Sequence, residues 1–241
     1  MVHFTRDGTF DKFIDGGDGR YRYTAQIVRA ENEFKAILNM KPKPMIRAQS
    51  PVGCFKYRIN VKNRDQGGVK PDWIKAVCFS ETPIAELSSF YQATTQRRNE
   101  YRKFGLAFWQ NFVRIKGGNP VLYVDTSTST FHASLDQMIL PQVISNFIST
   151  LPFYQHFGRR WPCDANDAGS IDFRWEREWR VPKDFEFDFS DVAFGICAQD
   201  RITEFESLVL NKFPFIDPDW DIPTIKAQLT IKGFSRLLMS I

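Results

Sequence analysis

The chain has 241 residues, of which 43% are hydrophobic, 25% charged and 15% aromatic, and its net charge is +4. A chain of this length buries about 70 to 75% of the surface that its unfolded form exposes, so its core needs no disulfide or metal. The composition argues against long disorder, and the sequence has neither an apolar run of about 18 residues nor a signal peptide, so we expect a cytoplasmic protein with no membrane span.

Apolar periodicity predicts alternating strands and helices in the first half of the chain. The predicted elements are a strand at Val2–Thr5, a short helix at Phe10–Ile14, a helix at Glu31–Met40, an extended segment at Val52–Val61, a loop at Asn63–Lys70, a strand at Trp73–Phe79 and a helix at Ile84–Tyr101. The KPKP run at 41–44 ends the second helix, because proline cannot continue its hydrogen-bond ladder.

The second half of the chain shows the same alternation. Its predicted elements are a turn at Gly117–Pro120, a strand at Val121–Val124, a long helix at Leu135–Phe153, strands at Asp172–Val181 and Val192–Cys197, a helix at Arg201–Leu210 and an amphipathic tail at Pro223–Ile241. No repeat, linker or step in composition divides the chain. The sequence therefore predicts one α+β domain over residues 1–241, with a helical insertion near 126–160.

The cysteines show no metal-binding pattern. The chain has 4 of them, and none is paired at the two-residue spacing of a zinc site. We expect reduced, buried thiols and no bound metal.

The segment DFRWEREWRV at 172–181 alternates between charged and apolar residues. Alternation with period two is typical of a strand with two unlike faces. On such a strand Glu176 and Glu178 lie on one face with Cβ atoms about 7 Å apart, and both carboxylates can meet one ligand. Trp175 and Trp179 are expected to anchor the other face in the core. The alternative is a solvated face whose glutamates pair with arginines across strands.

Two further segments present polar groups at strand ends. In HFT at 3–5, His3 and Thr5 share a face while Phe4 points into the core. In VCFSETP at 77–83, a buried strand ends in small polar groups just before a helix, where ligands often bind. The alternatives are a structural histidine in the first segment and a helix N-cap at Ser80 or Thr82 in the second.

These three segments, in this order, resemble the ADP-ribosyltransferase superfamily, with its His-x-Thr strand, its aromatic residue before a helix and its glutamate on a late strand. The matching residues are HFT at 3–5, CFSE at 78–81 and EREW at 176–179. Flanking text between about residues 70 and 182 also resembles the AbiGi-like group of bacterial proteins associated with abortive phage infection. The resemblance implies an ADP-ribosyltransferase fold, a single domain with a split mixed β-sheet core and surrounding helices.

The resemblance also implies NAD as a substrate. His3, with Thr5 beside it, would hold ribose hydroxyls of NAD. Phe79 would take the place of the aromatic that stacks on nicotinamide, although the tyrosine of the family is missing there, and Ser80 would lie beside it. The departure leaves stacking as the only role that transfers.

In the same resemblance Glu178 is the catalytic residue, which stabilises the oxocarbenium-like state as nicotinamide leaves. Glu176 would face the acceptor and orient or deprotonate it. The sequence leaves open which of the two carboxylates lies deeper. The implied protein is a toxin of an anti-phage system, of the abortive-infection or toxin–antitoxin kind, that transfers ADP-ribose to a macromolecule and has an antitoxin partner.

A basic, aromatic segment suggests the acceptor. QRRNEYRKFG at 96–105 carries Arg97, Arg98, Arg102 and Lys103, which can neutralise phosphates while aromatic rings stack on bases. RNA or single-stranded DNA is therefore slightly favoured over a protein acceptor. The alternative is a solvated basic helix face beside a core rich in phenylalanine.

Two other classes of function remain open. A non-catalytic antitoxin or binding partner of a phage-defence toxin would bind no NAD. A metal-dependent nuclease would hold Mg²⁺ with Asp172, Glu176 and Glu178, but Arg174 and Arg180 would crowd the cation. Neither a P-loop nor a GxGxxG, GxSxG or HExxH motif is present.

Overall fold

The computed structural model describes residues 1–4, 30–48, 75–98, 103–125, 153–159, 170–171 and 174–240. They form helices and strands, and the strands pair mostly antiparallel, which confirms the predicted α+β class. The chain divides into two compact units: unit 1 comprises Met1–Ile46, Thr82–Phe112 and Glu186–Ile241, and unit 2 comprises Arg47–Glu81 and Val113–Phe185. Within the described residues no helix is long and apolar enough to cross a membrane.

The strands of unit 1 lie in the order β12 (Phe215–Ile216), β11 (Val192–Ile196), β4 (Gly105–Phe108) and β1 (Val2–Phe4). β4 pairs antiparallel with both β1 and β11, whereas β11 and β12 run parallel. A parallel pair needs a crossover, which here contains helix α7 (Ile202–Leu208). The strands predicted at the N-terminus and at 192–197 are confirmed.

Helices occupy the positions that the periodicity predicts in unit 1. Residues 30–39 are helical, and the predicted helix at 84–101 is the 3₁₀ helix η2 (Ile84–Glu86) followed by α3 (Leu87–Arg98). The remaining elements of this part of the chain are α4 (Gln110–Ile115), which continues into unit 2, η5 (Phe189–Asp191), η6 (Gln199–Arg201), α8 (Ile222–Ile231), η7 (Ser235–Ser240), and the strands β2 (Met45–Ile46) and β10 (Phe185–Glu186).

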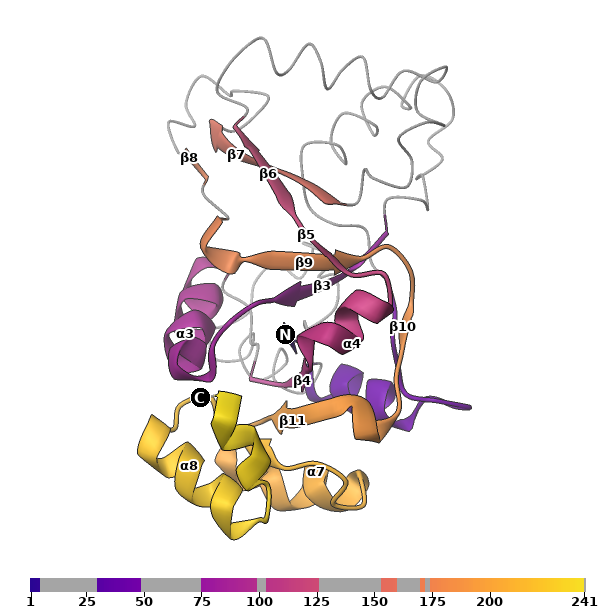
Figure 1. Cartoon of the computed structure of the whole chain (residues 1–241), viewed down its shortest axis with the longest axis vertical. Coiled ribbons are helices and arrows are strands. Elements are labelled where there is room, and N and C mark those ends of the chain that lie inside the picture. The colour runs from indigo at the N-terminus through magenta and orange to yellow at the C-terminus, as the bar shows by residue number, and fades with distance from the viewer. Residues whose placement is uncertain are drawn as a thin grey trace, which may run out of the picture. The chain divides into compact units, whose positions relative to one another are not determined.

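The start of α8 follows from its local sequence. Asp221 precedes the helix, and its Oδ1 accepts a hydrogen bond from the backbone N–H of Thr224 at 2.8 Å. Proline occupies the first turn, where its missing N–H is not needed. The predicted amphipathic tail therefore becomes a capped helix with an apolar face, packed beside β11 (Figure 1).

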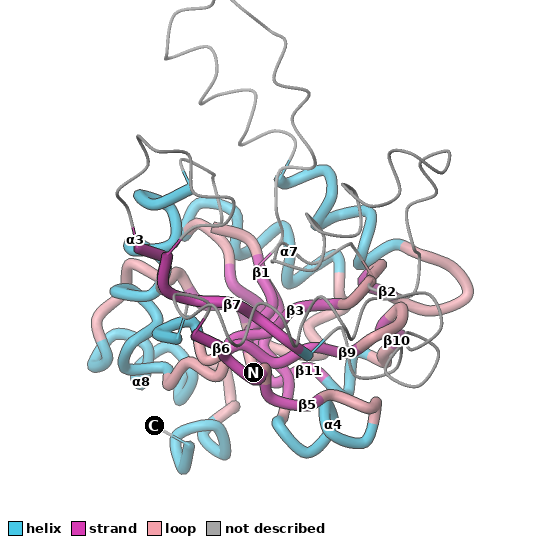
Figure 2. Tube along the Cα trace, turned by 90° about the horizontal axis from the view of Figure 1, so that it is seen from above, coloured by secondary structure: helices cyan, strands magenta, loops and turns pink. Residues whose placement is uncertain are grey.

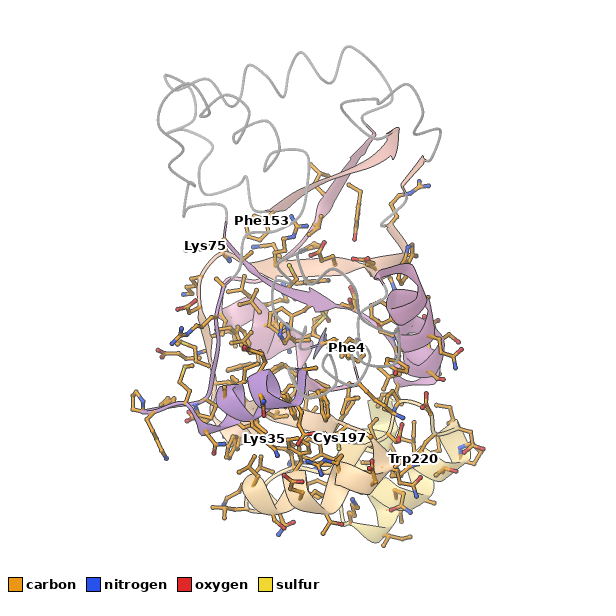
Figure 3. The ribbon with its side chains drawn as sticks, turned by 180° about the vertical axis from the view of Figure 1, so that it is seen from behind. Phe4, Lys35, Lys75, Phe153, Cys197 and Trp220 are labelled. Atoms are coloured by element: carbon orange, nitrogen blue, oxygen red, sulfur yellow. The ribbon has the colours of Figure 1, made fainter. Side chains whose placement is uncertain are left out.

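The core of unit 1 combines strand and helix residues that the sequence patterns single out. One cluster contains Val2, Phe4, Leu87, Ala107, Phe194, Ile196, Ile216, Ile225, Leu229 and Leu237. Phe4 lies among them, as predicted (Figure 3). A second set consists of stacked or tilted phenylalanine rings, with Phe34 centred 5.1 Å from Phe205 and Phe205 centred 5.6 Å from Phe215. These rings give part of the abundant phenylalanine of the sequence a role in packing.

The described residues of unit 2 form two groups of strands. The first has the order β3 (Val77–Ser80), β9 (Glu178–Val181) and β5 (Asn119–Pro120), and the second has the order β6 (Leu122–Asp125), β7 (Tyr154–Arg159) and β8 (Ser170–Ile171). The parallel strands β6 and β7 run side by side (Figure 2). The strands predicted at 73–79 and 121–124 are therefore present with shifted ends.

Several sequence predictions fall outside the described residues. These are the short helix at 10–14, the extended segment at 52–61, the loop at 63–70 and nearly all of the helix at 135–153. Of the insertion predicted as helical near 126–160, the structure describes 153–159, where 154–159 form β7. These residues are extended because their backbone pairs with β6 on one side and β8 on the other.

Gly195 of β11 lies against the ring of Phe215 on the neighbouring strand. A Cβ added at this glycine would lie 2.2 Å from Phe215 Cε1, and the ring is fully buried among other phenylalanines. We predict that Gly195→Ala lowers the free energy of unfolding by about 1 to 3 kcal/mol, measured by denaturant titration. Phe215→Leu in the same chain should make the combined loss smaller than the sum of the two single losses. Full additivity would contradict this steric explanation.

Candidate functional site

The strand predicted over 172–181 is shorter than the alternation suggests. Residues Arg174–Glu176 form the 3₁₀ helix η4, Arg177 has φ of 40°, and β9 starts only at Glu178. The prediction that Glu176 and Glu178 project from one strand face is therefore wrong. Alternating charges do not distinguish a continuous strand from a tight turn that leads into one, and here the left-handed residue separates the two.

The prediction that both Trp175 and Trp179 anchor the core is correct for only one of them. Trp179 is 8% exposed, which confirms it as a core anchor, whereas Trp175 is 38% exposed and is not one. Trp175 lies on η4, so the period of a strand does not govern its direction. The Nε1 of Trp179 donates to Glu81 Oε2 at 2.9 Å, which satisfies its buried polar edge.

Pairing of β9 with its neighbours assembles a polar face in unit 2. Glu178 lies opposite Ser80, and Arg180 lies opposite Cys78 on β3 and opposite Asn119 on β5. Directly opposite residues project to the same side of a sheet. We call this set, Glu178, Arg180, Ser80, Cys78 and Asn119, the β9 polar face.

The alternate residues form the other side of the same strands. Val77 and Phe79 of β3 lie opposite Val181 and Trp179 of β9, and all four are buried. The period-two reading is thus correct for β3 and for the four residues of β9.

A buried ion pair occupies the centre of the β9 polar face. Arg180 Nε donates to Glu178 Oε1 at 3.1 Å, and Nη2 donates to Oε2 at 2.8 Å. The side chain of Arg180 is 2% exposed and that of Glu178 is 10% exposed. A carboxylate and a guanidinium removed from water need such a two-point contact, because either charge alone would be strongly destabilising.

The electrostatics of the pair follow from this geometry. Burial by itself would lower the pKa of Arg180, but the charge of Glu178, together with the interactions with Cys78 and the hydrogen bonds to both side chains, raises that pKa above its ordinary value. The thiol of Cys78 is also hydrogen-bonded to the guanidinium. Arg180 is therefore a permanent cation, and it favours the ionised form of the carboxylate beside it.

Tyr123 of β6 reaches the same carboxylate-bearing residue. The backbone N–H of Glu178 donates to the hydroxyl of Tyr123 at 2.9 Å. Burial, followed in smaller part by the charges of Glu178 and Glu176, raises the pKa of Tyr123 to about 12. The phenol therefore stays protonated at neutral pH.

The predicted site residues separate into groups. Glu178 and Ser80 meet on the β9 polar face, while Glu176 lies partly buried on the turn before it. Phe79 lies on the opposite side of β3, 1% exposed, with its ring centred 4.8 Å from that of Phe185. This core packing leaves Ser80 as the residue of the segment that faces the carboxylate.

The N-terminal segment belongs to unit 1. His3 is partly exposed on β1, opposite Leu106 of β4, and its neighbour Phe4 is buried as predicted. Thr5 lies outside the described residues. The alternation expected of this strand is therefore present over the part that the structure describes.

The basic residues proposed for nucleic acid differ in their surroundings. Arg97 and Arg98 end helix α3, and Arg102 lies outside the described residues. Lys103 Nζ lies 2.7 Å from Asp219 Oδ2 and 3.3 Å from Asp217 Oδ1. Burial would lower the pKa of Lys103, but these carboxylates raise it. Its charge is thus compensated within unit 1.

The sequence reasoning gave no site role to Arg180, Cys78 or Tyr123. The spacing of Glu178 and Arg180 on one strand was a readable signal for their ion pair. The pairing register that places Cys78 opposite Arg180 depends on the tertiary structure and cannot be read from the sequence. The same holds for the contact of Tyr123 with Glu178, which lies 55 residues away in sequence.

Comparison with protein-family models, with curated proteins and with solved structures finds no match. Within the described ranges there is also no group of three or more histidine, cysteine, aspartate or glutamate side chains arranged to hold a metal ion. The chemistry of this protein is therefore inferred from its own residues.

The ion pair makes a sharp prediction about stability. Arg180→Leu leaves the Glu178 carboxylate buried without its partner and should lower the free energy of unfolding by about 3 to 5 kcal/mol. Replacing both residues with leucine should recover most of that loss, because the unpaired charge disappears. Denaturant titration of the parent, the single and the double variant measures both effects. A double variant less stable than Arg180→Leu would refute this account.

Proposed function

We propose that the protein is an NAD-dependent ADP-ribosyltransferase and that Glu178 is its catalytic carboxylate. The proposal is supported chiefly by the β9 polar face, where a carboxylate is held on the first residue of a strand by two hydrogen bonds from Arg180. A rigid strand positions such a group more firmly than a loop. The side chain keeps 10% of its exposure, so it is not sealed from a ligand.

The reaction breaks the bond between nicotinamide and C1′ of the ribose, and the bonding electrons leave with nicotinamide as a neutral base. The ribose carbon gains oxocarbenium character, and an ionised carboxylate stabilises that positive charge. The acceptor then bonds to C1′ and loses a proton. Glu176, on the turn before β9 rather than beside Glu178 on the strand, is assigned to orient the acceptor or take this proton.

We assign to NAD binding only those residues of the resemblance whose surroundings in the structure allow contact with a ligand. Ser80 faces the carboxylate and can hydrogen-bond a ribose hydroxyl. Phe79 is already packed in the core of unit 2, so we do not assign it to nicotinamide stacking. The role of His3 and Thr5 as ribose ligands stays a prediction of the resemblance, and the assignment concerns the residues of unit 2.

We further propose that the enzyme acts as a toxin in an anti-phage system and modifies nucleic acid rather than protein. The basic end of α3 at Arg97 and Arg98, followed by Arg102, supports a phosphate-bearing acceptor. Lys103 contributes less to this surface, because two carboxylates already hold its ammonium group. An antitoxin is the expected partner.

The first test replaces the proposed catalytic carboxylate. Glu178→Gln should reduce transfer of labelled ADP-ribose from NAD to separated pools of RNA, DNA and protein by about 100-fold or more. It should also relieve growth inhibition in bacteria.

Glu81→Gln is the matched control, because Glu81 is an exposed glutamate of unit 2 whose replacement still offers an oxygen to Trp179. Unfolding curves for both variants separate lost chemistry from lost folding. A folded Glu178→Gln protein with parental activity would refute the catalytic assignment.

The second test measures binding of the substrate. NAD that binds only the folded protein must raise its stability, by about 2.7 kcal/mol at a concentration of one hundred times Kd. We therefore expect a higher melting temperature in millimolar NAD. ADP-ribose and adenosine serve as partial ligands that show which portion of NAD contributes. An unchanged melting temperature would favour the alternative, a binding partner of a toxin in which Glu178 and Arg180 only stabilise the sheet.

A further inference from the structure

Tyr123 joins the two groups of strands in unit 2. Its backbone belongs to β6, where it lies opposite Gln155 of the parallel strand β7. Its hydroxyl accepts the hydrogen bond of the Glu178 backbone N–H on β9 at 2.9 Å. A side chain of one strand group thus binds the main chain of the other at the residue that carries the proposed catalytic carboxylate.

The contact replaces a missing bond of the β5–β9 ladder. Asn119 and Pro120 pair with Arg180 and Trp179, and the next backbone donor, Val121 N–H, bonds the carbonyl of Glu178 at 2.8 Å. In a regular antiparallel pair the N–H of Glu178 would return a bond to the carbonyl of residue 121. Here the phenol of Tyr123 takes that donor instead, two residues further along the chain.

The contact of Tyr123 stabilises a backbone junction at which Arg177, the residue before Glu178, is strained. Arg177 has φ of 40°, a left-handed conformation that costs about 1 to 3 kcal/mol for a residue with a side chain. Its carbonyl accepts a hydrogen bond from the N–H of Glu81 at 3.1 Å. The junction between turn and strand is therefore held on one side by Glu81 and on the other by Tyr123.

We propose that Tyr123 is a positioning residue of the site: its hydroxyl fixes the backbone at the start of β9 and thereby orients the Glu178 carboxylate toward Arg180 and the substrate. The catalytic part of this inference rests on the proposed function, whereas the structural part does not. Phenylalanine fills the same space but cannot accept the N–H, so the Glu178 donor loses its partner.

The experiment compares Tyr123→Phe with the parent. Hydrogen exchange of the Glu178 amide should be about 10-fold faster, because one hydrogen bond is lost. The NMR resonance of the Arg180 Nε–H group, which donates to the carboxylate, should shift as the pair is reoriented. In NAD turnover, kcat should fall by about 10-fold while KM for NAD changes little, since the loss concerns orientation in the transition state.

Tyr91→Phe is the control, because it removes a phenol from α3 in unit 1. It should leave the Glu178 amide, the Arg180 resonance and kcat at parental values. Unchanged exchange of the Glu178 amide in Tyr123→Phe would overturn the inference. Faster exchange with an unmoved Arg180 resonance and a parental kcat would also overturn it, because Tyr123 would then only close the ladder.

NAD binding and turnover by the parent protein test the proposed function independently of the effect of Tyr123→Phe. If the parent binds and consumes no NAD, that function fails, and the Glu178 amide and the Arg180 resonance decide the inference. Faster exchange with a shifted resonance in Tyr123→Phe then supports orientation of Glu178 by Tyr123, and an unchanged amide or an unmoved resonance overturns it.

Discussion

The buried pair of Glu178 and Arg180 is the constraint on which the candidate site depends. Two opposite charges at alternate positions of one short strand are removed from water, and each needs the other to stay there. Their direction fixes which side of β9 is polar, and the register with β3 then places Ser80 and Cys78 on that side. The apolar side, with Trp179, anchors the same strand in the core of unit 2.

The same ion pair determines the charge state of Glu178 in its proposed catalytic role. A guanidinium favours an ionised carboxylate, which is the form that a cationic transition state needs, but it also compensates part of the negative charge. In a partly buried site the remaining interaction with a developing cation is stronger than it would be in water. Arg180 is also more deeply buried than Glu178, so of the two charged groups the carboxylate is the more accessible to a ligand. In the proposed function, catalysis and stability share this one contact, so each variant must be assayed for both.

Local sequence patterns predicted those elements whose apolar residues recur with a single regular spacing and so form one buried face. The buried residues of β1 and β11 follow from alternation, and the apolar spacing of the tail at 223–241 matches the buried face of α8. At 172–181 the same rule failed, because a 3₁₀ turn and a left-handed Arg177 interrupt a run of alternating charges. Each unit is also assembled from separate stretches of chain, so no step in composition could mark a boundary between them. The hydroxyl of Tyr123 was beyond prediction for a related reason, since only the folded arrangement of β6 and β9 brings it to Glu178.

Net charge is a weak guide to partners when basic residues are already paired. Lys103 lies between Asp217 and Asp219, Arg201 bonds Glu31, and Lys35, marked in Figure 3, bonds Glu31 and Glu204. These contacts compensate cationic groups within unit 1. The case for a nucleic-acid acceptor therefore depends on other basic residues, chiefly Arg97 and Arg98, which end helix α3. A guanidinium also suits that role better than an ammonium, because it can bind a phosphate through two parallel hydrogen bonds.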